Sequence, residues 1–247
     1  MFTYGHIKDI EDVRDWIMEK LNLGAPPTVD LRPKCPPVYD QGALGSCTSN
    51  AISFLYQFDL LQNHDIDFLP SRLFLYYHER FIEGTAATDS GAQIRDGMKV
   101  MNATGLAAER WWPYDVTKFA VPPASDAMVS AFHHKSIKYL SVKQDEGQLK
   151  QVLATGQPIA FGFSVFTEFE SDTVATTGIV ALPGPDEEVI GGHAVAMVGY
   201  DDSKRSFLVR NSWGEEWGLK GHFWLPYAYV LDPNLASDFW VLNTITG

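Results

Sequence analysis

The chain of 247 residues contains few cysteines and few basic residues. Its two cysteines, Cys35 and Cys47, can form at most one disulfide, which excludes the class of small secreted domains held together by disulfides. Its 19 lysines and arginines stand against 31 acidic residues, giving a net charge of −12. Because binding to phosphates requires clustered lysine and arginine, we expect no nucleic-acid partner.

The sequence also lacks long apolar runs and metal-binding patterns. No run approaches the roughly 18 apolar residues of a membrane-spanning helix, and the first residues show no basic region followed by an apolar core. We therefore predict neither a membrane partner nor a signal peptide, and leave the compartment open between the cytoplasm and export without a recognisable signal. The seven histidines are scattered without zinc-ligand spacing, so we expect no metal and no other cofactor.

What the sequence does contain is the composition of a globular protein. Hydrophobic residues make up 45% of the chain and aromatic residues 13%, enough for a sizeable core. The first half has mainly helical periodicity and the second half is rich in strand signals, a pattern typical of an α+β chain in two lobes. We expect a monomer.

Hydrophobic periodicity predicts where the elements lie. Helices are expected from Ser71 to near Gly84, over 92–102 and over 145–155, the last with Asp145 as its N-cap. The first of these would bury Leu73, Phe74, Tyr77 and Phe81. Strands are expected at 136–142, 158–166, 178–182, 193–200, 207–211, 222–225 and 239–242.

One short stretch, QGALGSC at 41–47, precedes a predicted helix. The apolar residues Ala51, Phe54, Leu55 and Phe58 follow the helical period, which places Cys47 at or just before the helix N-terminus. The helix dipole and the free N–H groups there stabilise negative charge, so a thiol loses its proton more easily and becomes a nucleophile. The alternative is an ordinary buried cysteine, since free cysteine is commonly buried.

Two further stretches, GGHAVAMVGY at 191–200 and NSWGEEWG at 211–218, flank a hairpin signal. If 201–205 is the loop, His193 faces residue 213 and lies within about two register positions of Asn211. A catalytic imidazole needs such a neighbouring group to orient it. Taken singly, His193 could be a core histidine and Asn211 a turn residue.

Together, the three stretches resemble the signature blocks of the papain family of cysteine peptidases, most closely its bacterial branch. The order Cys, His, Asn and the distance from Cys47 to His193 fit the family's signature. The resemblance implies an α+β, two-lobed fold, with a mainly helical lobe at about 28–133, a β-barrel-like lobe at about 134–247 and a cleft between them. The chain departs from the family at Leu44, usually a cysteine, and at Thr48, usually a tryptophan.

The resemblance also implies catalytic roles. Cys47 would attack the scissile carbonyl as a thiolate, His193 would pair with it and protonate the leaving amine, and Asn211 would orient the imidazole. Gln41 would help to form the oxyanion hole, and Trp213 would shield the Asn–His hydrogen bond from water. By themselves, Gln41 would be an ordinary loop amide and Trp213 an ordinary core aromatic.

By the same resemblance, the substrate-binding residues are Ser90, Gly91, Gly162, Gly192, Ala194 and Trp213. Gly91 would pair with the substrate backbone. Gly91, Gly162 and Ala194 would line the pocket for the second residue on the acyl side of the cut bond. Their small size predicts a roomy, apolar pocket for a large hydrophobic residue, unless Tyr227 or Tyr229 from the floor region 225–231 closes it.

Residues 1–27 precede the part that resembles the mature enzyme. The apolar residues Ile7, Ile10, Val13, Trp16 or Ile17, and Leu21 follow an amphipathic pattern, and GAPP at 24–27 ends it as a linker. The segment is placed like a prosegment, although it is shorter than the family's usual one. One hypothesis is that it packs across the cleft and keeps the enzyme inactive until cleaved; the alternative is an arm that braces the fold.

The resulting expectation is a cysteine-type endopeptidase that acts on peptides or proteins through an acyl-enzyme and is made as a zymogen. Two other classes remain open. One is a catalytically silent papain-like binding module, and the other is a Cys-dependent acyltransferase, which would share the acyl-enzyme and differ in the acceptor. Labelling of Cys47 separates the first from a peptidase, and product analysis with added amine separates the second.

Overall fold

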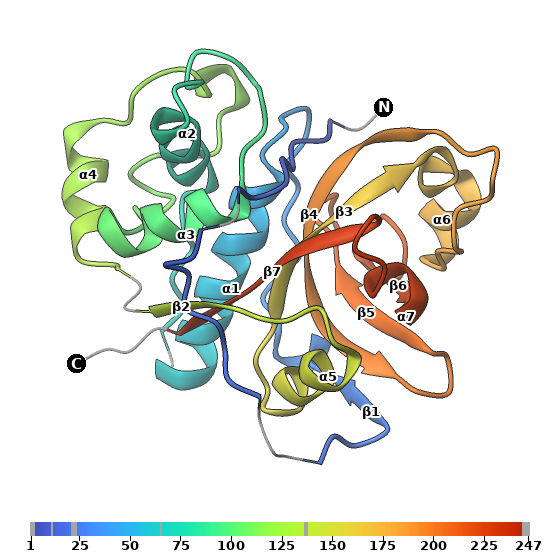
Figure 1. The fold of residues 1–247 in the computed structure, drawn as a ribbon. Coiled ribbons are helices and arrows are strands. Elements are labelled where there is room, and N and C mark those ends of the chain that lie inside the picture. The colour runs from blue at the N-terminus through green and yellow to red at the C-terminus, as the bar shows by residue number, and fades with distance from the viewer. Residues whose placement is uncertain (1–2, 11, 21–23, 65, 136–137, 244–247) are drawn as a thin grey trace.

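The computed structural model describes residues 3–10, 12–20, 24–64, 66–135 and 138–243. Figure 1 shows two parts side by side, a group of helices and a curved antiparallel sheet, with the long helix α1 (Cys47–His64) between them. This confirms the predicted α+β class with two lobes. In the described parts of the chain, no helix is long and apolar enough to cross a membrane.

Among the described residues, the helical part contains the four helices α1 to α4, of which α1 packs against α2 and α3. The helix α2 begins where predicted because the Ser71 hydroxyl accepts a hydrogen bond from the Phe74 N–H at 3.1 Å, which caps its N-terminus. The long α1 is buried over most of its length, since it also contacts the sheet. The remaining helices of this part are α2 (Arg72–Ile82), α3 (Ile94–Ala103) and α4 (Ser125–Phe132).

The sheet has the strand order β2-β7-β3-β4-β5-β6, and β1 pairs with β4. Every ladder between the described strands is antiparallel. The strands are β1 (Thr28–Asp30), β2 (Lys138–Ser141), β3 (Ile159–Phe166), β4 (Val189–Asp201), β5 (Ser206–Arg210), β6 (His222–Pro226) and β7 (Ala236–Asn243). Three helices accompany them: α5 (Glu146–Ala154), α6 (Asp172–Thr177) and α7 (Tyr227–Val230). Asp145 caps α5, as predicted, by accepting from the Gln148 N–H.

Two local predictions are wrong. In α2, Phe81 was expected to be buried but is 61% exposed. The buried face of the helix includes Tyr76 and Arg80 instead, because their polar groups form hydrogen bonds with Asp89 and Thr88. A hydropathy pattern cannot identify such partners. The expected strand at 178–182 does not form. Gly178 takes a left-handed conformation at the end of α6, and only Ile179 makes a bridge, to Trp224.

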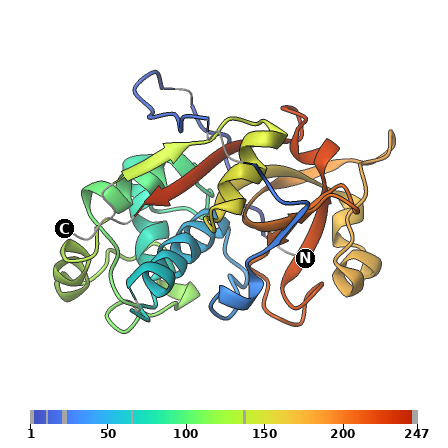
Figure 2. The ribbon, with the colours of Figure 1, turned by 90° about the horizontal axis from the view of Figure 1, so that it is seen from below.

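The N-terminal arm, defined here as the described residues of 3–20, forms no helix, although its apolar residues follow an amphipathic pattern. It runs as an extended chain along the junction of the two lobes, dark blue in Figure 1 and seen from below in Figure 2. Its backbone finds partners on the body of the protein: for example, the Met18 N–H donates to the Ser141 carbonyl at 2.7 Å. Side chains expected on a buried face are therefore exposed, and Leu21 lies outside the described residues. The exposed ones are Ile7, Ile10, Val13, Trp16 and Ile17.

The two phenylalanines of α2 provide a matched test of this burial. Phe74 is fully buried, so Phe74→Ala should lower the free energy of unfolding by about 3–5 kcal/mol through the cavity it leaves. Phe81→Ala, on the exposed face, should change it by less than about 0.5 kcal/mol. Urea unfolding of both variants measures this, and equal losses would contradict the observed orientation of α2.

Candidate active site

The thiol of Cys47 lies at the N-terminus of α1 and is fully buried. The backbone N–H groups of Ala194 on β4 and of Gly5 in the arm hydrogen-bond its sulfur, as does that of Thr48. Burial nevertheless raises the pKa of the Cys47 thiol to about 11, because the loss of water outweighs these donors. The thiol is therefore protonated near neutral pH while the arm covers it.

His193 lies on β4, one residue before Ala194. Its Nε2 is 2.8 Å from Asn211 Oδ1, and the same oxygen accepts the Ser212 N–H at 2.8 Å. Since an N–H can only donate, the Asn211 atom that faces the Ser212 N–H must be the amide oxygen, which is an acceptor. The His193 Nε2 that contacts this oxygen must therefore carry a proton and donate it. Within the described part of the chain, Nδ1 has no hydrogen-bond partner, so this nitrogen is the one available to accept a proton.

The surroundings of His193 keep water away from the imidazole. Trp213 stacks on the ring with 5.0 Å between the centroids, and Phe163 meets it edge-on. Burial lowers the pKa of His193 to about 4, and the hydrogen bond that its Nε2–H donates to Asn211 opposes this only in part. The imidazole, like the thiol, is neutral in this state of the molecule.

Gln41 is held by the residue that follows Asn211. Its Oε1 accepts the Ser212 hydroxyl at 2.6 Å, so its Nε2 must point the other way. That nitrogen donates to the carbonyl of Thr3 in the arm at 3.1 Å and to the carbonyl of Leu44 at 2.8 Å. An amide N–H in this position can stabilise a negatively charged oxygen.

The small residues proposed to bind substrate lie against the arm. Gly192 accepts the His6 N–H through its carbonyl at 2.9 Å. A Cβ at Gly162 would lie 2.0 Å from a ring atom of His6, and one at Gly91 would lie 2.2 Å from the Gly5 carbonyl oxygen. Glycine therefore permits a close approach that no other residue allows at these places. Ala194 pairs with Gly162 across the sheet.

Two further details describe this edge of the cleft. Ala92 makes the backbone pairing with the arm: its N–H donates to Gly5 at 2.7 Å, and its carbonyl accepts from Ile7 at 3.0 Å. Ser90 is exposed and donates to Thr85 and to the Gly91 carbonyl, away from the arm.

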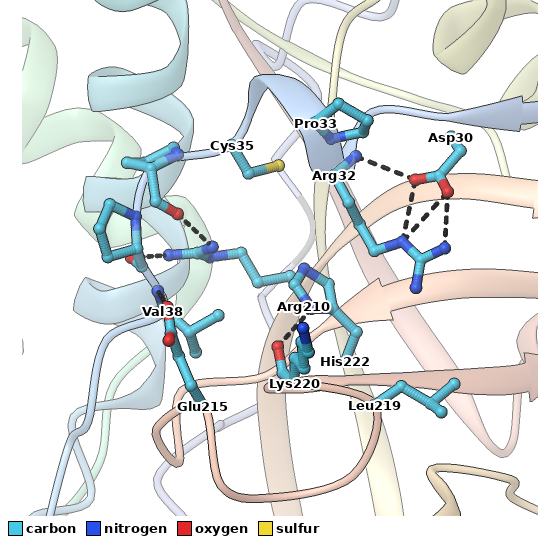
Figure 3. Close-up of a pocket in the computed structure, with 12 residues that line it drawn as sticks. Asp30, Arg32, Pro33, Cys35, Val38, Arg210, Glu215, Leu219, Lys220 and His222 are labelled. Carbon is cyan, nitrogen blue, oxygen red and sulfur yellow. Dashed lines mark hydrogen bonds and ion pairs between the residues drawn. The ribbon is translucent and has the colours of Figure 1, made fainter.

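The second cysteine lies elsewhere, at a cavity of about 740 Å³ (Figure 3). Both thiols are free. Burial raises the pKa of Cys35 to about 12, so this thiol is unreactive near neutral pH. Beside it, the buried Arg210 donates to the carbonyls of Pro36 and Pro37, which ties the segment before Gln41 to the end of β5.

Sequence reasoning missed three residues of the site. Ser212 holds both Gln41 and Asn211, and its position next to Asn211 was the only available signal. Glu170 accepts the hydroxyl of Tyr4 at 2.6 Å. Asp238, on β7, contacts His6 at 2.9 Å. The last two contacts join residues more than 160 positions apart, so no local pattern points to them.

Comparisons with known proteins agree with this site. The model of the papain family cysteine proteases matches residues 25–230. Xylellain, a cysteine protease from Xylella fastidiosa, superposes with a TM-score of 0.92 at 42% identity, over 98% of this chain and 96% of its own. An uncharacterized peptidase C1-like protein of Acanthamoeba polyphaga mimivirus is 42% identical over 99% of this chain and 88% of its own. A cathepsin B-like protein of Giardia intestinalis is 29% identical over 81% of this chain and 68% of its own.

The chain belongs to the papain family of cysteine proteases. It is thus a peptidase, a hydrolase whose substrates are peptides or proteins. The resemblance stated from the three sequence blocks is confirmed, and the similarity to a bacterial protease is consistent with the bacterial branch.

Substitution of Ser212 tests whether its hydroxyl orients the Gln41 amide. Ser212→Ala removes the donor to Gln41 Oε1 and should let the amide turn, which we expect to lower kcat/KM on a peptide substrate about tenfold or more. The matched control is Ser206→Ala, a buried serine at the far end of β5 whose hydroxyl bonds the Lys204 carbonyl. Equal activity in the two variants would show that Ser212 does not position Gln41.

Proposed function

We propose that this protein is a cysteine-type endopeptidase whose own N-terminal arm closes the cleft. The observation that carries the proposal is that the arm lies on both sides of the thiol. The Thr3 carbonyl bonds Gln41 on one side, His6 bonds Gly192 on the other, and Gly5 passes over Cys47. A cleft that holds a chain on both sides of the nucleophile suits cleavage inside a polypeptide.

In the proposed mechanism, the proton of Cys47 passes to Nδ1 of His193, and the thiolate attacks the carbonyl carbon of the substrate. Gln41 donates to the oxygen that becomes negative. The C–N bond then breaks as His193 returns the proton to the leaving amine, which leaves a thioester on the sulfur. A water molecule deprotonated by His193 hydrolyses that thioester and regenerates the thiol. Asn211 keeps the imidazole oriented throughout.

The direction of the arm explains why it would resist cleavage. In a substrate, the carbonyl that faces Gln41 belongs to the residue before the cut bond, and an earlier residue fills the pocket at Gly162. In the arm, that carbonyl belongs to Thr3, whereas a later residue, His6, lies against Gly162. The arm therefore runs opposite to a substrate, and no peptide bond of it is presented to the thiol in the productive direction.

The arm also supports the neutral state of the catalytic pair. Cys47 and His193 are both fully buried, and burial is the main cause of both pKa shifts. An ion pair of thiolate and imidazolium needs solvent or fixed dipoles around it. We infer that release of the arm readmits water and allows the ion pair to form.

The arm is attached mainly through polar contacts. Arg95 on α3 pairs with Asp12 and with Asp15, and the Asp9 carboxylate accepts from Trp240 at 2.7 Å. Most apolar side chains of the arm face solvent, and only Tyr4 and Met18 of its described residues pack against the core, so the hydrophobic contribution to its attachment is small. Segments with this kind of attachment open at low free-energy cost, which suits a segment that must be released.

Cutting the folded chain in place tests the inhibitory role. A recognition sequence for a specific protease, inserted in the exposed linker at Gly24, allows the arm to be severed after folding. The uncut chain should be nearly inactive on a fluorogenic peptide. The cut chain, freed of the arm by gel filtration, should be at least about a hundredfold more active, since an arm held at millimolar effective concentration is lost.

Labelling with an epoxysuccinyl peptide, read by intact mass, separates the possible outcomes. Labelling of Cys47 only after the cut supports both the nucleophile and the inhibitory arm. Equal labelling before and after would reduce the arm to a brace. If neither form is labelled while Cys47 is reduced, the chain is a silent binding module.

The pKa of Cys47 predicts how alkylation depends on pH. Only the thiolate reacts, so in the uncut chain the iodoacetamide rate should rise about tenfold per pH unit across pH 6–9.5, because the pKa lies near 11. In the cut chain the pKa should fall and the rate should level off within this range. The Cys35→Ser background leaves Cys47 as the single thiol. A plateau below pH 9 in the uncut chain would contradict the proposed neutral state.

A further inference from the structure

The loop that carries Gln41 and Cys47, defined here as residues 41–47, is not held by a disulfide. The chain has Leu44 where the family usually has a cysteine, and both of its cysteines are free thiols. The loop joins two donors of the proposed reaction. One is the Gln41 amide, and the other is the N–H of Cys47 in the first turn of α1, where N–H groups have no partner within the helix. The spacing of these donors therefore depends on whatever else holds the loop.

The hydroxyl of Tyr114, in the connection between α3 and α4, contacts both ends of this loop. It donates to the Gln41 carbonyl at 2.8 Å and is hydrogen-bonded to the Ser46 hydroxyl. Because a carbonyl can only accept, the single proton of the Tyr114 hydroxyl points to Gln41, and the Ser46 hydroxyl must donate to the Tyr114 oxygen. Residues 41 and 46 are thereby joined through one oxygen atom.

The other partners of Ser46 agree with this direction. Asn50 Nδ2 donates to the Ser46 hydroxyl oxygen at 3.1 Å and to the Ser46 carbonyl at 2.8 Å. Asn50 Oδ1 accepts from Arg72 on α2 at 3.2 Å, which fixes the orientation of the Asn50 amide. Ser46 and Asn50 are almost completely buried, so water cannot easily replace these bonds. A directed series of hydrogen bonds thus leads from α2 through Ser46 and Tyr114 to the Gln41 carbonyl.

The ring and backbone of Tyr114 are held separately from its hydroxyl. The Arg72 guanidinium lies 4.1 Å from the centroid of the ring, and the Tyr114 N–H donates to Glu109 at 2.8 Å. Arg72 and Glu109 form an ion pair at 3.6 Å. A phenylalanine at position 114 would therefore keep these contacts and remove the hydroxyl alone.

From these contacts we propose that Tyr114 is a positioning residue, whose hydroxyl sets the spacing between the Gln41 amide and the Cys47 N–H. The proposal rests on the proposed peptidase mechanism, in which these donors stabilise the oxygen that becomes negative. Without the hydroxyl, the Gln41 main chain loses this tie to Ser46, and a small displacement of a donor costs much of its effect. The thiol lies at the start of α1 and keeps its own reactivity. Tyr114 therefore acts on the stabilisation of the oxygen, not on the nucleophile.

The test uses the chain cut in place at the linker and compares three measurements in Tyr114→Phe. For benzyloxycarbonyl-Leu-Arg-aminomethylcoumarin, kcat should fall about tenfold or more, while KM should change less than about threefold. The aldehyde acetyl-Leu-Leu-argininal takes up the Cys47 thiol across its C=O bond, and the oxygen of the adduct needs the same donors. Its inhibition constant should therefore rise by about the factor by which kcat falls. Alkylation of Cys47 by iodoacetamide, which creates no such oxygen, should change less than about threefold.

A matched control keeps the result specific. Tyr200→Phe removes another hydroxyl that donates to a main-chain carbonyl, that of Pro26 at 2.6 Å, and should leave all three measurements within about twofold. An unchanged kcat in Tyr114→Phe would overturn the positioning role, as would an equal loss of aldehyde affinity and alkylation rate. Absence of both cleavage and labelling in the unaltered cut chain would instead show that the proposed peptidase function fails.

The direction of the bonds provides a second measurement. Ser46→Ala removes the donor to the Tyr114 oxygen and should also lower kcat about tenfold. Because both hydroxyls serve the same tie, the double variant of Ser46→Ala and Tyr114→Phe should lie within about threefold of Tyr114→Phe alone. A loss in the double variant equal to the product of the two single losses would show that the hydroxyls act independently, which would contradict the proposed tie.

Discussion

The passage of Gly5 over the thiol is the contact on which the state of this site depends. A side chain at Gly5 would meet the Gly45 carbonyl oxygen at 1.7 Å, so only a glycine can cross here. Gly5 packs against Cys47 and Tyr4 against His193, and both side chains are completely buried, away from the water that their charged forms require. The neutrality of the pair is thus a consequence of burial to which the arm contributes.

The arm and a substrate would depend on the same glycines. A Cβ at Gly91, at Gly162 or at Gly192 would meet an arm atom within 2.4 Å. Any polypeptide that reaches the thiol must pass the same three positions. Under the proposed function, a larger residue at any of these glycines would hinder the arm and a substrate alike, so self-inhibition and activity would depend on the same residues.

The sequence contained enough information for the fold class and for the central groups of the site. The helix after Cys47 and the hairpin that brings His193 to Asn211 follow from periodicity and a short loop, because both are local features. The path of the arm was not predictable in this way. The amphipathic pattern of its apolar residues did not indicate this path, because the backbone of the arm forms hydrogen bonds with distant segments, such as the bond from Met18 to Ser141.

Asp238 and Ser212 were missed for a related reason. Asp238 is separated from His6 by 232 positions, and only the folded sheet brings β7 beside the pocket. Ser212 is adjacent to Asn211, but its function arises from its contact with Gln41, at the other end of the chain. Residue type and spacing identified the groups that could react, whereas the groups that position them required three-dimensional contacts.

The hydrogen bonds that orient the catalytic groups do not involve the arm. His193 is held by Asn211, Asn211 by Ser212, and Gln41 by Ser212, all within the body of the protein. The arm adds its backbone at the thiol, the Thr3 carbonyl at Gln41 and the Tyr4 ring, which packs edge-on against His193. Under the proposed function, release of the arm would therefore require no rearrangement of the orienting contacts. It would change the access of water, and with it the charge of two groups that already stand in place.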